Sequence, residues 1–163
     1  MPKEILINLL MADSPYVSTP GGWTFERDAT ANHGSLDFWV DLAKLAERGL
    51  LDCVFLADTF GVFDVYKGGA EESIRRGVRL PAHDPILTIP AMAHATRNVC
   101  FAVTQNTSFE QPYLLARRLA TLDHLTGGRL AWNIVTGFQQ SAAEAMGLEL
   151  IRSWTPDLIL VDS

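Results

Sequence analysis

The chain has 163 residues, a hydrophobic fraction of 48% and a formal net charge of −6 at pH 7, which suits one globular domain with a core of its own. The acidic balance argues against nucleic acid or an anionic membrane as the main partner, because both attract basic surfaces. The sequence has neither an apolar run of ~20 residues nor a signal-peptide pattern, so we expect a cytoplasmic protein that does not enter a membrane. Cys53 and Cys100 each lie inside an apolar run, where small buried thiols are favoured over a disulfide.

Strands and helices alternate along the first part of the chain. An apolar run over 5–11 predicts a buried strand, and the run 53–57, which ends at Asp58, predicts a second one. Between them, apolar side chains at spacings of three and four predict a helix over 35–49, with Ser35 as its N-cap and Gly49 at its end. The predicted buried stripe of this helix consists of Leu36, Trp39, Val40, Ala43, Ala46 and Leu50.

The same alternation continues further along the chain. Asp84 followed by Pro85 is typical of a helix start, and this helix is expected to reach about residue 96. A third strand is predicted over 99–104 and a fourth over 130–135. The remaining predicted helices run from Pro112 to Gly127 and over about 139–146.

The predicted strands are almost continuously apolar, which indicates a parallel sheet covered by helices. No G-x-G-x-x-G turn follows the first strand, as a dinucleotide-binding doubly wound sheet would require, so a (β/α) barrel is favoured. Connections 12–33 and 59–83 are long. Both follow the carboxyl ends of strands, where such folds bind ligands, and we expect them to contribute to a functional site. The alternative is that they are disordered insertions.

Polar side chains follow three of the predicted strands. Asp58 closes the second strand, Thr104 lies at the end of the third, and Asn133 and Thr136 lie at the end of the fourth. In a parallel barrel these groups converge on one mouth, where they can orient a planar polar ligand. The alternative is that each side chain only caps its own strand or the loop that follows.

Histidine spacing gives no metal-binding motif. The four histidines are His33, His83, His94 and His124, and none of them pairs at the short spacings that zinc sites use, so no metal site is predicted. An alternative interpretation of the strand ends is a metal-dependent α/β hydrolase that uses Asp58, His83 and Asp84.

Three blocks, in order, resemble one enzyme family: residues 38–58, 104–113 and 117–136. The last begins Arg117-Arg-Leu-Ala-Thr-Leu-Asp-His and ends Trp-Asn-Ile-Val-Thr136. These blocks resemble the bacterial luciferase-like flavin-dependent monooxygenases, in the subgroup that contains nitrilotriacetate monooxygenase component A, dibenzothiophene-sulfone monooxygenase and the pristinamycin synthase oxygenase. The resemblance covers roughly residues 1–148.

The resemblance implies an α/β fold that forms the N-terminal half of a (β/α)8 TIM barrel, with about four parallel strands and covering helices. It implies an FMN-dependent monooxygenase whose reduced flavin comes from a separate NAD(P)H-dependent reductase. A C4a-(hydro)peroxyflavin, formed with O2, would then oxygenate a small organic substrate. Asp58 and Thr104 are the positions carried over as flavin contacts, and Asn133 and Thr136 are added from their place at a strand end. Catalytic residues are not assigned. Trp23 and Phe60 are possible apolar walls on the substrate side, but a role as plain anchors of their loops is favoured for both.

After Gly147 the resemblance ends, so we divide the chain into a partial barrel domain over 1–148 and an off-pattern tail over 149–163. A complete barrel takes roughly 250 residues, and the phosphate-binding loops are expected to lie outside this sequence. The alternative to an active oxygenase is therefore a truncated, non-catalytic remnant with weak or no flavin binding. Pairing of two half-barrels in a homodimer is one way in which the site could be completed.

Overall fold

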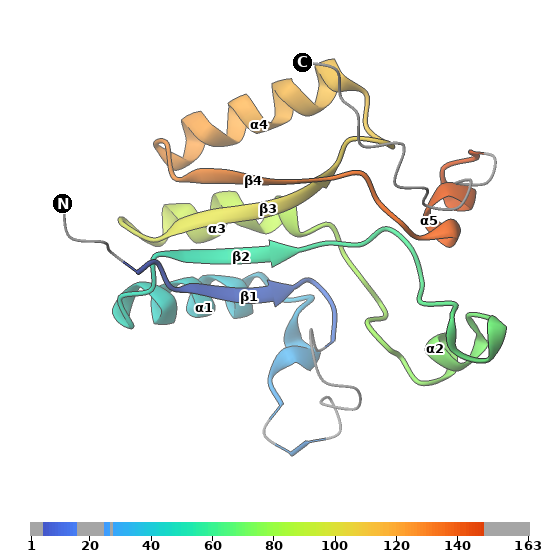
Figure 1. Ribbon diagram of the computed structural model, residues 1–163. Helices are drawn as coiled ribbons and strands as arrows, with labels where there is room; N and C mark the ends of the chain where they lie inside the picture. The colour runs from blue at the N-terminus through green and yellow to red at the C-terminus, as the bar shows by residue number, and fades with distance from the viewer. Residues whose placement is uncertain (1–4, 16–24, 27, 149–163) are drawn as a thin grey trace.

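The computed structural model describes residues 5–15, 25–26 and 28–148. Four strands form one parallel sheet in the order β1-β2-β3-β4 (Figure 1). They are β1 (Asn8–Ala12), β2 (Cys53–Ala57), β3 (Cys100–Asn106) and β4 (Leu130–Val135). The predicted parallel α/β sheet is confirmed, and every strand directs its carboxyl end to the same edge.

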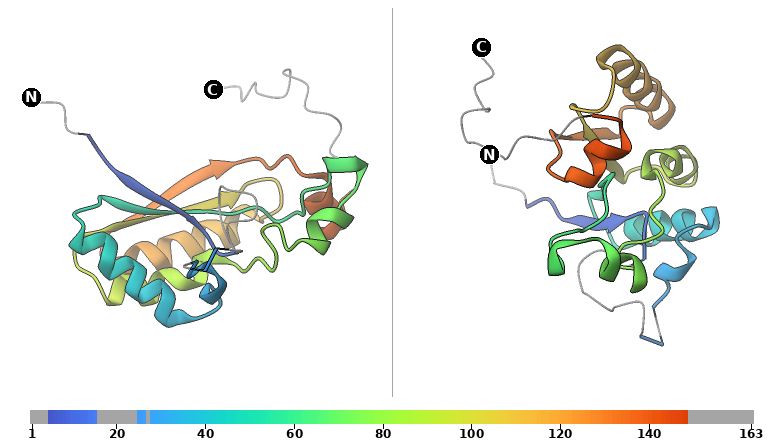
Figure 2. Two further views of the ribbon diagram at one scale, coloured as in Figure 1. Left: turned by 90° about the horizontal axis from the view of Figure 1, so that it is seen from below. Right: turned by 90° about the vertical axis from the view of Figure 1, so that its right-hand side faces the viewer.

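Three helices cover one face of the sheet, which Figure 2 shows from below. They are α1 (Leu36–Arg48), α3 (Ile89–His94) and α4 (Pro112–Thr126), and the 3-10 turn η4 (Pro85–Thr88) leads into α3. Two short helices, α2 (Glu71–Arg75) and α5 (Gln140–Ala145), lie beyond the carboxyl edge (Figure 2). The turns η2 (Thr30–Asn32) and η3 (Tyr66–Gly68) belong to the long connections after β1 and β2. Within the described ranges, none of the helices has the length and apolar character needed to cross a bilayer.

The core lies between the sheet and the three covering helices. Alternate residues of β2 and β3 point toward the helices, because side chains of a strand alternate between its two faces. Each large apolar side chain that becomes fully buried in this layer contributes roughly 1.5–3 kcal/mol to stability. The fully buried members of the core are Trp39, Ala43, Ala46, Val54, Leu56, Ile89, Met92, Val99, Phe101 and Val103.

Local sequence signals place most element ends correctly. The strands β2 and β4 occupy the predicted ranges. Helix α4 begins at Pro112 and is closed by Gly127, whose φ of 67° is in the left-handed region that favours glycine. Asp84 acts as the predicted cap, since its carboxylate accepts a hydrogen bond of 3.2 Å from the Ile86 N–H.

Other local predictions are wrong. Strand β1 begins at Asn8 rather than residue 5, because its register partner Cys53 is the first residue of β2 and the preceding residues have no strand to pair with. Leu36 and Leu50, predicted to be buried, are 56% and 87% exposed. Leu36 opens α1, and Leu50 follows its end with a φ of 56°, so neither lies over the sheet. Helix α2 has five residues, too few to give a periodic signal.

The face of the sheet away from the helices carries a mixture of small, polar and apolar side chains, among them Asn8, Phe55 and Ala102. Cys53 and Cys100 are neighbours on it in the β2–β3 register. Both are free thiols, as predicted. Trp23 and the predicted tail over 149–163 lie outside the described residues.

Candidate functional site

A cavity of about 500 Å³ lies at the carboxyl ends of β2, β3 and β4, and this size is in the range of small-molecule sites. All four residues that the sequence singled out line it: Asp58, Thr104, Asn133 and Thr136. They lie together because parallel strands end at one edge, as the sequence argument assumed. We call this cavity the carboxyl-edge pocket.

The floor of the carboxyl-edge pocket contains a polar pair. Thr104 of β3 and Asn133 of β4 are opposite each other in the strand register. The Asn133 Nδ2 donates a hydrogen bond of 3.0 Å to the Thr104 Oγ1. Because a hydroxyl can donate while it accepts, the Thr104 proton stays available for a ligand.

The wall of the pocket is aromatic. Phe60 follows β2, Phe109 follows β3, and Phe138 follows β4, and all three line the cavity. The rings of Phe60 and Phe109 have centroids 6.0 Å apart and planes inclined by 48°, within the range of favourable aromatic contacts. Phe60 therefore lines the cavity, and its role on the substrate side stays a prediction.

Helix α5 is joined to the segment after β2 by side-chain hydrogen bonds. The Gly61 N–H donates to Gln139 Oε1 at 3.1 Å, and the Val62 N–H donates to Ser141 Oγ at 3.0 Å. The Ser141 hydroxyl in turn donates to the Val62 carbonyl at 2.9 Å. These contacts fix Gln139 at the edge of the cavity, while its buried Nε2 has no hydrogen-bond partner among the described residues.

Gly137 closes the pocket between β4 and α5. Its φ is 78°, and a Cβ at this position would overlap the side-chain amide of Asn106 and approach Phe109 Cε2 to 3.2 Å. The Asn106 side chain is itself fixed, because its Oδ1 accepts from the Ser108 N–H at 2.7 Å. Position 137 therefore requires glycine for both backbone and space.

Asp58 is the one carboxyl group among the described residues that line the pocket, and its surroundings perturb its pKa. Burial, followed by the negative charge of Asp84, raises the pKa of Asp58 to about 6. The positive charge of Arg79 opposes this rise but does not cancel it. A carboxyl group with a pKa in this range can hold or release a proton near neutral pH.

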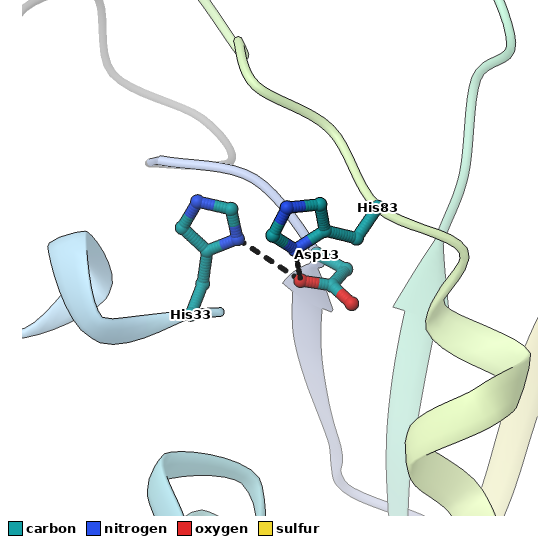
Figure 3. Close-up of side chains that lie close together, drawn as sticks. All are labelled: Asp13, His33 and His83. Carbon is teal, nitrogen blue, oxygen red and sulfur yellow. Dashed lines mark hydrogen bonds and ion pairs between the residues drawn. The ribbon is translucent and has the colours of Figure 1, made fainter. Parts of the chain in front are cut away.

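A second polar cluster lies beside the end of β1, and Figure 3 shows its three side chains. The His33 Nδ1 is 3.0 Å from Asp13 Oδ1, and the His83 Nδ1 is 3.4 Å from the same oxygen. Asp13 and His33 are buried, whereas His83 is exposed. We call these three residues the aspartate–histidine cluster.

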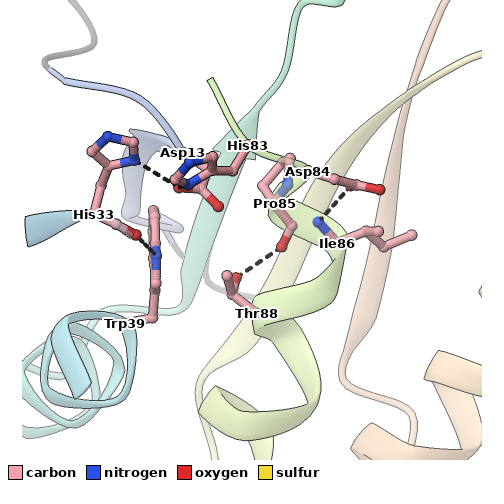
Figure 4. Close-up of polar contacts among 8 residues, drawn as sticks. All are labelled: Asp13, His33, Trp39, His83, Asp84, Pro85, Ile86 and Thr88. Carbon is pink, nitrogen blue, oxygen red and sulfur yellow. Dashed lines mark hydrogen bonds and ion pairs between the residues drawn. The ribbon is translucent and has the colours of Figure 1, made fainter. Parts of the chain in front are cut away.

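The hydrolase alternative does not have its expected ligand set. Within the described part of the chain, the one group of potential metal ligands close enough to share an ion is Asp13, His33 and His83. His83 therefore belongs with Asp13 rather than with Asp58 and Asp84. The Asp84 carboxylate caps η4 instead (Figure 4).

Sequence reasoning did not find several residues that shape these sites. Gln139 lies at the start of a helix and belongs to no recognisable binding motif. Asp13 and His33 lie 20 residues apart in a long connection. A polar residue directly after the first strand was a usable signal for Asp13, in the same way as for Asp58. Nothing in the sequence indicated that His33 or Gln139 would join a site.

Comparison with known proteins gives one consistent result. The family model described as luciferase-like monooxygenase matches residues 18–155. Dimethyl-sulfide monooxygenase of Hyphomicrobium sulfonivorans is 44% identical over 91% of this chain and 31% of its own length. Long-chain alkane monooxygenase of Geobacillus thermodenitrificans is 40% identical over 93% of this chain and 34% of its own. Nitrilotriacetate monooxygenase component A of Aminobacter aminovorans is 32% identical over 78% of this chain and 29% of its own length.

Solved structures agree with these relatives. Crystalline long-chain alkane monooxygenase (LadA) superposes with a TM-score of 0.90 at 40% identity, over 94% of this chain and 36% of its own. Riboflavin lyase (RcaE), crystallised with modified FMN and riboflavin, superposes with a TM-score of 0.84 at 33% identity. The match covers 91% of this chain and 34% of riboflavin lyase. The chain thus spans about a third of the length of the relatives that it matches.

Proposed function

The chain belongs to the luciferase-like monooxygenase family, and from this premise we propose that it binds the ring of FMN in the carboxyl-edge pocket and takes part in oxygenating a small organic substrate. The observation that carries the proposal is the buried, unpartnered Gln139 Nε2 at the edge of that pocket. A buried donor without an acceptor costs about 1–3 kcal/mol, and a carbonyl of a bound flavin would remove that cost.

The other polar groups of the pocket suit the same ligand. The Thr104 hydroxyl accepts from Asn133 and can donate its own proton to an acceptor on the flavin edge. Thr136 is exposed at the rim, where it would contact the part of the ligand nearest to solvent. Asp58, with its raised pKa, would hold or move a proton beside the ring. Flavin binding by Asp58, Thr104, Asn133 and Thr136 is a proposal that rests on this placement.

The pocket offers the flavin phosphate no cation. Among the described residues that line it there is neither lysine nor arginine. A phosphate prefers arginine, lysine or a helix N-terminus. The proposal for this pocket is therefore limited to the ring, and the phosphate would be bound by groups outside the lining.

The apolar wall supports a small apolar substrate. Phe60 and Phe109 can exclude water from the ring and pack against hydrocarbon groups. Two relatives are named for dimethyl sulfide and long-chain alkanes, which suits such a wall. Reduced FMN, when bound, would supply the chemistry that activates O2 and delivers one oxygen atom. One relative is named as component A of a monooxygenase, which supports a separate NAD(P)H-dependent reductase as the source of that reduced flavin.

The decisive experiment is a titration of the chain with FMN, followed by quenching of flavin fluorescence. We expect saturable binding with a Kd on the order of micromolar, about −8 kcal/mol. Gln139→Glu retains the oxygen that accepts from Gly61 but loses the Nε2 donor. It should therefore weaken binding at least about tenfold, the effect of losing one good hydrogen bond to a buried ligand group. Unchanged affinity in Gln139→Glu would contradict the assigned contact.

A matched control separates this effect from the added charge. Gln111→Glu introduces the same change at the N-cap of α4, where the side chain is exposed, and it should leave FMN affinity unchanged. Circular dichroism on both variants would show that the fold is retained.

A second candidate is a non-catalytic protein with weak or no flavin binding, the alternative that the sequence left open. The observation that favours it is the absence of a basic residue from the described pocket lining. Absence of saturable binding up to millimolar FMN would favour this candidate. The predicted homodimer stays a prediction, and sedimentation velocity with and without FMN would test it.

A further inference from the structure

The aspartate–histidine cluster draws its side chains from three separate segments. Asp13 directly follows β1, His33 follows η2, and His83 immediately precedes the cap of η4. Both imidazoles point their Nδ1 atoms at the single oxygen Oδ1 of Asp13 (Figure 3). The ring centroids of the two histidines are 4.7 Å apart, and the three ligand atoms all lie within 4.8 Å of one another.

The backbone around the cluster is fixed by bonds that do not involve the imidazoles. The His83 N–H donates to the Asp13 carbonyl at 2.8 Å. The indole Nε1 of buried Trp39 donates to the His33 carbonyl at 2.7 Å (Figure 4). A Cβ at Gly34 would lie only 3.3 Å from His83 Cε1, so the glycine leaves room for the His83 ring. The ligand atoms are therefore positioned in advance, and little order has to be created when an ion binds.

The two separations between Asp13 Oδ1 and the histidine nitrogens fit the edges of a metal polyhedron. With Zn–N and Zn–O bonds of about 2.0–2.2 Å, the edge of a tetrahedron joining two ligand atoms is on the order of 3.3 Å. The O···N separations of 3.0 and 3.4 Å in the cluster bracket that value. An ion could enter with small movements of the three side chains.

The chemistry of the donors selects the class of ion. Two imidazole nitrogens and one carboxylate oxygen suit borderline divalent transition metals such as zinc, cobalt and nickel. Magnesium and calcium require ligand sets composed mainly of oxygen. The side chain of Asp13 is 3% exposed, whereas that of His83 is 46% exposed. The carboxylate is thus removed from water, and the His83 side leaves an access route and an open coordination position.

We propose that Asp13, His33 and His83 form a binding site for one divalent transition-metal ion of the zinc type, with a fourth position open to solvent. Asp13 lines a small cavity together with Asp58, so the site adjoins the carboxyl-edge pocket, but none of the three ligands lines that pocket, and metal binding can be tested without flavin. A bound ion would link the segments after β1 and β2 to each other. It would therefore stabilise the folded chain by a free energy that grows with the logarithm of the ion concentration once that concentration exceeds the Kd.

The test is calorimetric titration of the tag-free, chelator-treated full chain with ZnCl2, together with the absorption spectrum of the chain with CoCl2. We expect one ion per chain. With cobalt, we expect visible absorption bands of the kind that a four-coordinate ion gives, and no sulfur-to-cobalt charge-transfer band. Zinc should raise the Tm, and excess MgCl2 should not displace it. Binding weaker than millimolar, or a cobalt–thiolate band from the Cys53 and Cys100 pair, would overturn the assignment.

Variants decide whether these residues are the ligands. His83→Ala should lower zinc affinity by at least about tenfold, since even loss of a group that supports a ligand costs 10–100-fold. The double variant His94→Ala/His124→Ala removes the two other, exposed histidines and should bind zinc as the unmodified chain does. If circular dichroism shows that His83→Ala does not fold, His83→Gln, whose side chain is closer in size to histidine, is titrated in its place. Equal affinity in the His83 variant and the unmodified chain would refute the site.

Discussion

Asn133 of β4 donates a 3.0 Å hydrogen bond from Nδ2 to Oγ1 of Thr104 on β3, and the two residues are direct register partners. This pair joins the strand ends that form the floor of the carboxyl-edge pocket. It therefore links the stability of the fold to the shape of the site.

Thr104→Val tests the pair. Valine keeps the volume but removes the acceptor, which leaves the Asn133 amide short of a partner in a partly buried site and should cost about 1–3 kcal/mol in the free energy of unfolding. Urea denaturation measures it. Thr121→Val is the matched control, because the Thr121 hydroxyl only donates to the Arg117 carbonyl on an exposed face of α4. Similar losses in the two variants would show that the Thr104–Asn133 bond contributes nothing specific.

Asp58 should make stability depend on pH in the acidic range. Its pKa in the folded chain is about 6, raised from 3.8 chiefly by burial and then by Asp84, so between these two values the folded state binds more protons than the unfolded state. The contribution of Asp58 to the free energy of unfolding must then fall as pH rises from about 4 to about 6 and level off above that range. Asp58→Asn removes this contribution to the pH dependence. The free energy of unfolding of the variant, relative to that of the unmodified chain, should therefore increase across the same pH interval.

Denaturation curves at pH 4, 5, 6 and 7.5 would measure the effect. Asp41→Asn, on an exposed position of α1, is the control. An advantage of Asp58→Asn that stays constant with pH would contradict the raised pKa.

Gly137→Ala should damage the pocket more than a similar change elsewhere. Both Gly137 and Gly128 have φ near 80°, but a Cβ at Gly128 meets nothing within 4 Å, whereas at Gly137 it overlaps the Asn106 amide. Gly128→Ala should therefore show only backbone strain, about 1–3 kcal/mol. Gly137→Ala should show that loss and, in addition, the displacement of Asn106. Thermal unfolding of both variants and FMN titration of the folded ones would measure the difference, and equal losses would contradict the close contact.

Arg129 should be irreplaceable by lysine. Its guanidinium donates to the carbonyls of Ala93, Thr96, Val99 and Thr126 and to the Thr96 hydroxyl. It also lies 5.6 Å from the centre of the Phe101 ring. A lysine ammonium cannot reproduce this planar set of donors, so Arg129→Lys should cost about 2 kcal/mol or more. Arg97→Lys, at an exposed position, should change the urea midpoint little, and a comparable loss there would refute the argument.

The elements that were predicted correctly have short-range causes. The run 53–57 is apolar and is bounded by Asp52 and Asp58, and β2 occupies it. Pro112 and Gly127 flank α4 because proline fits a helix start and glycine tolerates the left-handed turn at its end. The first residue of β1 depends instead on a distant partner, because Asn8 pairs with Cys53. The apolar pattern of a single strand cannot predict such a boundary.

The sequence by itself determined the alternation of strands and helices, the parallel sheet, and the convergence of Asp58, Thr104, Asn133 and Thr136. Each of these follows from neighbours in the chain and from the common direction of parallel strands. Only the tertiary structure decided that His33 and His83 approach Asp13 and that Gln139 lies at the edge of the pocket. These contacts depend on the path that each long connection takes between its two elements. That path is set by the packing of the whole fold rather than by any local sequence pattern.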